Sequence, residues 1–279
     1  MRCREKMQCG IALIAVLWLV AAMSLITAGI VQSVRAEVQT VGLQKQAAVA
    51  IAQADAAILL ALQALHNRQK DVGKDVQKMP VEFEGVTYQV SLQPLNGRID
   101  INAAPLALLA DLYRYAGGMQ ANQAQNLAQS TIDTRQQKNA KGIPREFDAI
   151  EDLLGVPGMT YGVYARLVDL ISAEIKDGTG RVNPSAAPPG VLLVLSGGNV
   201  ARTADFAAQR GATPMVMDTS FFKPEYIDSA STKSLNIQVA VNLVDGAILQ
   251  RSWHVYWEAD PRSGLPWRML SSQKSVQQN

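Results

Sequence analysis

The sequence predicts an α+β protein in which a long N-terminal helix precedes an antiparallel β-sheet and an all-α segment is inserted into that sheet. Three observations support this prediction: an uncharged apolar run at residues 11–31, alternating apolar and polar residues at 81–92 and 237–257, and a helix-rich stretch between these β segments. Alternation is typical of half-buried strands, whereas apolar residues at steps of three and four are typical of helices.

The apolar run follows a basic leader, residues 1–10, which carries three basic residues and one acidic residue. Residues 11–31 contain no charge, and a helix of this length spans about 31 Å, which matches the hydrocarbon core of a bilayer. The positive leader is expected to stay in the cytoplasm, with the rest of the chain on the other side of the membrane. We therefore expect one transmembrane helix at residues 11–31.

The residues alone leave three interpretations of this segment open. It can be an uncleaved membrane anchor. It can be a secretory signal cut after Ala36, although its apolar run exceeds the usual length of about 7–15 residues and Arg35 lies in the site. It can also be a prepilin segment cut between Gly10 and Ile11, which leaves the helix on the mature protein.

The helix is predicted to continue without a break through residues 32–66. This stretch contains no Pro and a single Gly, and a helix from residue 11 to residue 65 is about 80 Å long. Its first half is expected in lipid, and its second half is expected to pack one weakly apolar face on a globular domain. That face is predicted to consist of Val34, Val38, Val41, Lys45, Ala48, Ala52, Ala56, Ile58, Leu59 and Leu62.

Composition argues against most enzyme classes. Apolar residues make up 48% of the 279-residue chain, enough to bury a sizeable core. Both cysteines, Cys3 and Cys9, lie in the leader, so a chain cut after Gly10 would have no thiol for catalysis or a disulfide. The two histidines, His66 and His254, are far apart and are expected to be surface or hydrogen-bonded residues rather than ligands. With no recognisable catalytic motif, we expect no enzyme.

Two β regions flank the helix-rich stretch. Residues 81–92 predict a hairpin that turns at Glu84 and Gly85. Residues 237–243 and 247–257 predict a second hairpin, and a turn at 260–264 leads into a further strand at 265–270.

Three residues of the last β region, Trp253, Val255 and Trp257, share one face of their strand. We expect them in the core, and an aromatic ligand platform is the alternative.

An internal repeat lies in and before the helix-rich stretch. Residues 97–105 (GRIDINAAP) match residues 180–188 (GRVNPSAAP) at a constant offset of 83. Each copy continues into an apolar segment and then a Gly-Gly pair. Pro105 and Pro188 suit the first turn of a helix, where the missing N–H costs nothing.

Between the two copies, the sequence predicts helix 147–154, a tight turn, and helix 161–171. The turn, with Gly155, Pro157 and Gly158, resembles the helix-hairpin-helix of non-specific DNA-binding proteins. Such binding depends on basic residues that neutralise phosphates, but residues 101–215 hold ten bases and ten acids. We therefore expect a structural turn and no nucleic acid, and keep DNA binding as the alternative.

Several motifs together resemble the protein K family, the large minor pseudopilins of the type II secretion pathway. They are GIALIAVLW at residues 10–18, RAE at 35–37, RIDINAAP at 98–105, FDAIEDLLGVPGMT at 147–160 and RVNPSAAP at 181–188. The resemblance covers nearly the whole chain. It is also consistent with Ala15 at the fifth position after Gly10, because this family usually lacks the Glu that most pilin-like subunits carry there.

The resemblance implies a pilin-like fold with an inserted helical domain, and prepilin cleavage between Gly10 and Ile11 with methylation of the new N-terminus. It implies a single-pass protein of the bacterial inner membrane whose globular part lies in the periplasm. There it would form or cap the tip of the pseudopilus, start its assembly and aid export of folded proteins. The implied partners are other minor pseudopilins, the prepilin peptidase, the inner-membrane secretion machinery, secreted substrates and the secretin.

The expected division of the chain is a leader at 1–10, a transmembrane helix at 11–31, its periplasmic continuation at 32–66, β segments at 67–101 and 215–279, and a helical domain at 102–214. Related proteins can bind calcium in the helical domain, so the resemblance leaves calcium open. The acidic residues form no EF-hand loop, and we assign no ligands. The alternatives are a membrane-anchored helix-hairpin-helix DNA-binding protein of the competence type and an unprocessed envelope protein.

Overall fold

The computed structural model describes residues 5–68, 72–138, 142, 144–212, 218–243 and 246–277. The elements follow one another as α1 (Glu5–Arg68), β1 (Gln77–Phe83), β2 (Val86–Pro94), η1 (Leu95–Gly97), β3 (Ile99–Asp100), α2 (Leu106–Asp111), η2 (Leu112–Ala116), α3 (Ala121–Gln136), η3 (Ile150–Gly155), α4 (Tyr161–Leu167), β4 (Ile171–Ser172), α5 (Pro189–Leu195), α6 (Val200–Ala212), β5 (Ser234–Asn242), β6 (Ile248–Tyr256) and β7 (Arg268–Gln277).

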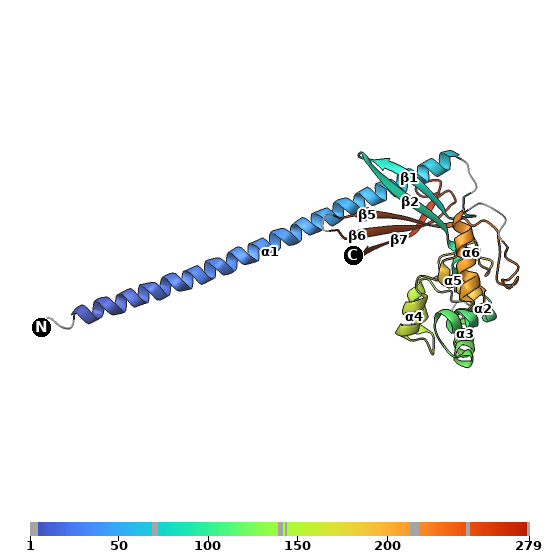
Figure 1. The fold of residues 1–279 in the computed structure, drawn as a ribbon, viewed down its shortest axis with the longest axis horizontal. Coiled ribbons are helices and arrows are strands. Elements are labelled where there is room, and N and C mark those ends of the chain that lie inside the picture. Colours follow the sequence, from blue (N-terminus) through green and yellow to red (C-terminus); the bar gives the residue numbers. More distant parts are fainter. Residues whose placement is uncertain are drawn as a thin grey trace.

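The longest element is α1, a continuous helix of 64 residues. Its N-terminal part projects away from the rest of the molecule, and its C-terminal part lies against the sheet (Figure 1). The predicted unbroken helix is confirmed. It begins within the leader, at Glu5, and ends at Arg68, just beyond the predicted end at residue 66.

Five of the seven described strands form an antiparallel sheet in the order β1-β2-β5-β6-β7. Neighbouring strands β2 and β5 are separated in sequence by the whole helical region, which is therefore inserted between two paired strands. The predicted hairpin turn is confirmed: Glu84 and Gly85 connect β1 and β2, both with positive φ (49° and 76°).

Strand β7 is longer than predicted. It was expected to end at residue 270 but continues to Gln277, paired with β6 throughout. Residues 271–277 are polar except for Val276 and are mostly exposed, because β7 is an edge strand, and so they lack the alternation from which strands are predicted.

One face of the sheet packs on the C-terminal part of α1. The helix residues buried in this core are Ala50, Ala54, Ala57, Ile58, Ala61, Leu62 and Leu65. Their partners include Ile237, Val239 and Val255 of the sheet, all nearly inaccessible to solvent. Alanines at the contact let the helix backbone approach the sheet closely.

The predicted packing stripe on α1 is therefore correct only at Ile58 and Leu62. Val34, Val38 and Val41 are exposed because the sheet covers the helix only from Ala50 onwards. Further along, the buried positions are 50, 54, 57 and 61, so the predicted Ala48 and Ala52 lie on the exposed side, as does Leu59. Sequence periodicity located the helix but not the face that the sheet covers.

A carboxylate on α1 also fixes the helix to β6. Arg251 Nε donates a hydrogen bond to Asp55 Oδ1 over 2.7 Å, and Trp253 Nε1 donates to the same oxygen over 2.9 Å. The core prediction for this face is confirmed for Val255, which is fully buried, and Trp253 and Trp257 are partly buried against the same core. The ring of Trp257 stacks on Trp267 with 5.9 Å between centroids.

The helical region has a second core, which runs from Ile99 to Tyr226. It is not all-α as predicted, because β3 and β4 form a short parallel pair in which Ile99 lies opposite Ile171. Both isoleucines are fully buried. Two-residue strands are too short to give a recognisable alternation in the sequence.

The helices around the predicted turn are shorter than expected. Only residues Ile150–Gly155 are helical before it, as a 3₁₀ helix, because the Asp152 carboxylate accepts hydrogen bonds from the N–H groups of Asp148 and Ala149 (2.8 and 3.1 Å) and Ala149 is extended. After the turn, α4 ends at Leu167 instead of residue 171, where the chain pairs with β3.

The two repeat copies pack against each other reciprocally. A Cβ atom placed on Gly97 would lie 2.4 Å from the carbonyl of Ala186, and one placed on Gly180 would lie 2.4 Å from the carbonyl oxygen of Ala103. At the offset of 83, each glycine is the first residue of its copy and each alanine the seventh. The repeat is therefore a pair of equivalent loops that fit into each other.

Each loop leads into a helix and is held by an arginine from the next one. Pro105 and Pro188 directly precede α2 and α5 as N-cap residues, one position before the predicted first turn. Arg135 near the end of α3 donates to the carbonyl oxygens of Ile101 and Ala104, both over 2.9 Å.

In the second copy, Arg210 of α6 donates to the carbonyl oxygens of Pro184 and Ala187, over 3.2 and 2.6 Å. These two residues correspond to Ile101 and Ala104 at the offset of 83. The likeness of the two copies thus extends beyond the matched sequence to the second helix of each.

Candidate functional site

The exposed part of α1 is the first candidate. Among the residues that the structure describes, α1 is long enough and apolar enough to cross a membrane. Its most apolar stretch is not buried in the protein. Large side chains such as Leu13, Trp18 and Leu25 are 70–75% exposed. A contiguous apolar surface of this extent requires lipid or a partner to cover it.

Polar side chains in this stretch are satisfied within the helix. The hydroxyl of Ser24 donates to the carbonyl of Val20, and that of Thr27 donates to the carbonyl of Met23, both over 2.8 Å. Such bonds back to the preceding turn remove the cost of placing a hydroxyl in hydrocarbon. The segment is thus chemically suited to a bilayer.

The predicted cleavage site, Gly10 and Ile11, lies in the backbone of α1. The side chains of both residues are outside the part that the structure describes, so cleavage there stays a prediction.

Beyond the apolar run, α1 has an exposed stripe that no described part of the protein covers. Val34, Val38 and Val41 follow at steps of four and three, so they share one face, and they are 50%, 65% and 58% exposed. This is the spacing by which one helix packs along another.

The predicted turn of the helical domain is solvent-exposed. Gly155, Pro157 and Gly158 are all exposed, while Val156 between them is buried and accepts a hydrogen bond from Met159 N–H over 3.0 Å. Gly158 has φ of +92°, a conformation that other residues rarely adopt. The structure thus brings the three predicted residues together in one tight turn.

Charges around this turn are mixed. Arg166, which lines a cavity beside Gly158, donates to the carbonyl of Gly117 over 2.8 Å. On the approach to the turn, Glu151 and Asp152 are exposed acids. Acids on the approach and an arginine already bonded to the protein are unfavourable for a phosphate.

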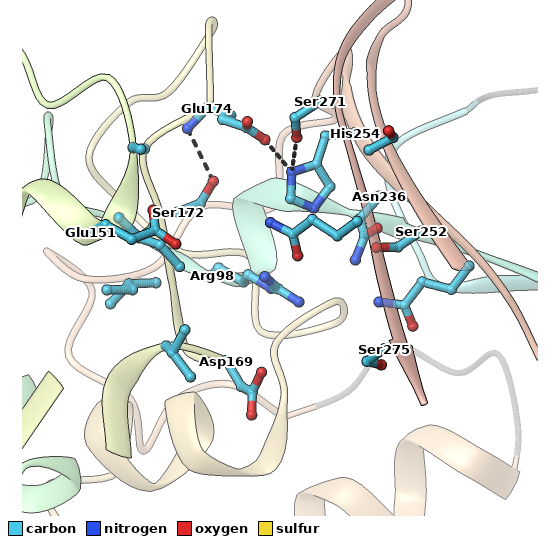
Figure 2. Close-up of a pocket in the computed structure, with 18 of the residues that line it drawn as sticks. Arg98, Glu151, Asp169, Ser172, Glu174, Asn236, Ser252, His254, Ser271 and Ser275 are labelled. Atoms are coloured by element: carbon cyan, nitrogen blue, oxygen red, sulfur yellow. Dashed lines mark hydrogen bonds and ion pairs between the residues drawn. The ribbon is translucent and has the colours of Figure 1, made fainter. Parts of the chain in front are cut away.

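A pocket that sequence reasoning did not predict lies between the sheet and the helical domain (Figure 2). Its volume is about 410 Å³, and polar side chains of β5, β6 and β7 form one wall. At one end, the His254 imidazole on β6 donates to the carboxylate of Glu174, and Ser271 Oγ lies 3.3 Å from the same nitrogen. The opposite wall carries Arg98, from the first repeat copy.

The charges in the pocket influence one another. Burial raises the pKa of Glu174, but its hydrogen bond to His254 and the charge of that ring outweigh burial and leave the pKa below its ordinary value. Burial lowers the pKa of the Arg98 guanidinium, while the charges of Asp169 and Glu174 act in the opposite direction. These residues come from segments far apart in sequence, so no spacing pattern could have grouped them.

Of the two histidines, only His254 lines the pocket, with Glu174 as its partner. His66 is exposed and lies near Trp257, and His254 is buried and hydrogen-bonded, as expected for residues that are not ligands. Among the residues that the structure describes, no three His, Cys, Asp or Glu side chains lie close enough to hold a metal ion.

Comparison of the chain with models of known protein families finds no match, and comparison with curated proteins finds none either.

Proposed function

We propose that this chain is a minor pseudopilin of the type II protein secretion system. The observation that carries the proposal is the division of α1: its first part is apolar and uncovered, and its last part packs on an antiparallel sheet. A subunit of a helical filament needs this combination, because the uncovered part serves as an anchor before assembly and packs on other helices afterwards.

In this proposal, residues 11–31 hold the protein in the bacterial inner membrane and the globular part lies in the periplasm. The prepilin peptidase cuts between Gly10 and Ile11. The chain then joins other minor pseudopilins to start pseudopilus assembly with the inner-membrane secretion machinery. The exposed stripe at Val34, Val38 and Val41 is the surface proposed for these helix contacts.

The helical domain supports a position at the tip. It lies at the end of the molecule far from the N-terminus, beside the sheet and away from the projecting helix (Figure 1). A bulky domain there would cap a filament and face secreted substrates and the secretin. At a tip, no subunit above offers an amine, and a carboxylate at Ala15 would be left unpaired in lipid at a cost of several kcal/mol.

The first experiment tests processing, with Gly10→Leu in cells that express the prepilin peptidase. The parent chain should be recovered with Ile11 as its first residue, and the variant should keep its leader. Gly29→Leu is the matched control, because a side chain there meets nothing within 4 Å. Mature protein that begins at Glu37 would instead establish a signal peptide and contradict the proposal.

The second experiment tests assembly, with Val38→Asp in the exposed stripe. Co-purification with co-expressed minor pseudopilins should fall at least about tenfold, because a charge replaces an apolar contact. Gln39→Asp is the control: it introduces the same charge at an exposed position that lies about 100–160° around the helix from each of the three stripe residues. Equal co-purification of the two variants would argue against this surface.

The competing function, a membrane-anchored DNA-binding protein, is distinguished by titrating the detergent-solubilised chain with labelled duplex at about 50 mM salt, where non-specific binding is strong. We expect no binding. Micromolar affinity that weakens steeply towards about 200 mM salt, and is lost when Gly155 and Gly158 are replaced, would favour the competitor.

A further inference from the structure

The helical domain is attached to the sheet at two neighbouring strands. Its covalent connections leave the end of β2 and enter the start of β5, and these two strand ends pair with each other. Beside them, the Asp177 carboxylate accepts a hydrogen bond from the N–H of Lys233 over 2.7 Å. The N–H of Lys176 donates to Ser234 Oγ, at the start of β5, over 3.1 Å. The domain is thus fixed to the strand at which it is connected.

Farther from these connections, an ion pair links the helical domain to the outer strands. His254 on β6 donates to the carboxylate of Glu174, which follows β4, and Ser271 Oγ on β7 lies 3.3 Å from the same ring nitrogen (Figure 2). His254 is only 7% exposed. This bond therefore lies in the contact between the domain and the outer part of the sheet.

The wall of the sheet that faces the helical domain is polar. Its side chains alternate along β5 and β6 with those that pack on α1, and they are Asn236, Gln238, Gln250, Ser252 and His254. Separating this wall from the domain exposes polar side chains, which water can solvate. The hydrophobic effect therefore does little to hold this wall against the domain, and the bond between His254 and Glu174 matters correspondingly more.

The charge of this bond depends on one proton. The other charged groups around the pair are Lys176 next to Glu174, Arg98, Asp169 and Glu151 on the helical side, and Lys274 on β7. Carboxylates, lysines and arginines ordinarily keep their charge between about pH 6 and pH 8, whereas imidazoles change theirs in this range. When the ring loses its second proton, a hydrogen bond from a neutral ring remains, but the attraction between two opposite charges is lost.

We propose that the bond between His254 and Glu174 is a proton-dependent latch. With the imidazole protonated, the latch holds the helical domain against β6 and β7. When the ring loses its second proton, the domain turns away about its connections to β2 and β5, and the pocket opens. This inference does not depend on the proposed role in secretion.

Glu174 sets the acidic limit of the latch. Burial raises its pKa, but the bond to His254 and the charge of that ring outweigh burial and leave the pKa below its ordinary value. A carboxylate with a lowered pKa stabilises the folded state above its unfolded-state pKa, and this contribution is lost only as the pH falls through the folded-state pKa. The latch is therefore expected to be closed in mildly acidic solution and to open as the pH rises to about 8.

The test measures a distance between the sheet and the helical domain in the full chain in detergent. Spin labels are attached to Thr87→Cys on β2 and Ala165→Cys on α4, both exposed positions, after Cys3 and Cys9 are replaced by Ser. Double electron–electron resonance then gives the distribution of distances at about pH 6 and about pH 8. We expect one dominant distance at the lower pH. A second distance should be at least about fivefold more populated at the higher pH, the factor expected when a charge–charge attraction is lost.

Three variants assign the change to the latch. His254→Gln should show the distribution of the higher pH at both pH values, because its side chain takes up no proton. Glu174→Gln should do the same, and it keeps the test valid if His254→Gln does not fold. His66→Gln is the matched control: it replaces the other of the two histidines, which is exposed on α1, and should keep the pH dependence of the parent. Asp100, whose pKa is raised by burial to about 6, is present in every variant, so its titration cannot distinguish them.

Several outcomes would overturn the proposal. One is a parent chain with the same distances at both pH values. Another is a pH dependence that persists in His254→Gln or in Glu174→Gln, because the opening would then depend on a different group. Loss of the pH dependence in His66→Gln would assign it to the wrong histidine.

Discussion

The two repeat copies of the helical domain share a backbone scheme but differ in what surrounds them. Both begin with a glycine packed against the other copy, and both have an arginine from a following helix on the same two carbonyls. They differ at the second residue, where Arg98 lines the pocket and Arg181 is exposed. The glycine and arginine contacts that hold each loop are thus present in both copies, whereas the position of the second residue in the pocket is found only in the first copy.

They differ also at the fourth residue. Asp100 Oδ1 accepts from the N–H of Asn102 over 2.9 Å, and Asn183 Oδ1 makes the equivalent bond with Ser185 over 3.0 Å. The same turn is therefore closed by a carboxylate in one copy and by a neutral amide in the other. The loop therefore requires an oxygen acceptor at this position, and it tolerates a buried carboxylate there.

The reciprocal packing should be broken most severely by Gly180→Ala. The added Cβ would overlap the carbonyl of Ala103, and the positive φ of 75° is unfavourable for alanine, so we expect a loss of about 4 kcal/mol. Gly97→Ala has the steric overlap without the positive φ and should cost about 3 kcal/mol. Hydrogen exchange of the helical domain, followed by mass spectrometry, measures the loss of stability in both variants.

Gly162→Ala in α4 is the control, because its Cβ would meet nothing within 4 Å. It should be neutral or slightly stabilising, since alanine favours helix. Exchange protection in Gly180→Ala equal to that of this control would contradict the close packing of the two copies.

Arg135→Met and Arg210→Met should each cost about 2–3 kcal/mol. Each removes charge-assisted hydrogen bonds and leaves carbonyl groups of a buried loop without a donor. Similar losses in chemical unfolding would support the equivalence of the two copies. Arg181→Met is the control, and its unfolding free energy should stay within about 0.5 kcal/mol of that of the parent. A loss as large as in Arg135→Met and Arg210→Met would show that the loss does not depend on the hydrogen bonds to the loop carbonyls.

The smallest effect is expected at Asp100, where burial raises the carboxyl pKa to about 6. Because this pKa lies above that of the unfolded chain, the folded state binds the proton more tightly, and the contribution to stability is lost as the pH rises through about 6. Asp100→Asn introduces the amide that Asn183 has in the second copy. As the pH rises from about 4 to about 7, the unfolding free energy of this variant should therefore increase by about 2 kcal/mol relative to that of the parent. A pH-independent difference between the two unfolding free energies would argue against a buried charge.

The sequence predicted the elements that rest on local signals. The long helix follows from the absence of breakers after residue 31, and the two hairpins from their alternation and turns. The prolines of the repeat predicted two helix starts, and two helices do begin directly after Pro105 and Pro188. These signals depend on neighbours in the chain.

Features that depend on distant partners could not be predicted. The face of α1 that is buried is decided by where the sheet covers it, and α4 ends early because Ile171 pairs with Ile99. The pocket joins Arg98, Glu174 and His254 only after the helical domain has packed against the sheet. No local pattern in the sequence carries that information.

The exposed middle of α1 sets the distance of the globular part from the membrane segment and its rotation about the helix axis. With residues 11–31 in a bilayer, the helix from Val31 to Ala50, its first buried residue, holds the globular part about 28 Å beyond the end of the membrane segment. Because that spacer is one rigid helix, inserting a single residue would raise the globular part by about 1.5 Å and turn it by about 100° around the helix axis. The length of this stretch therefore sets which side of the helical domain any neighbour in the membrane would meet.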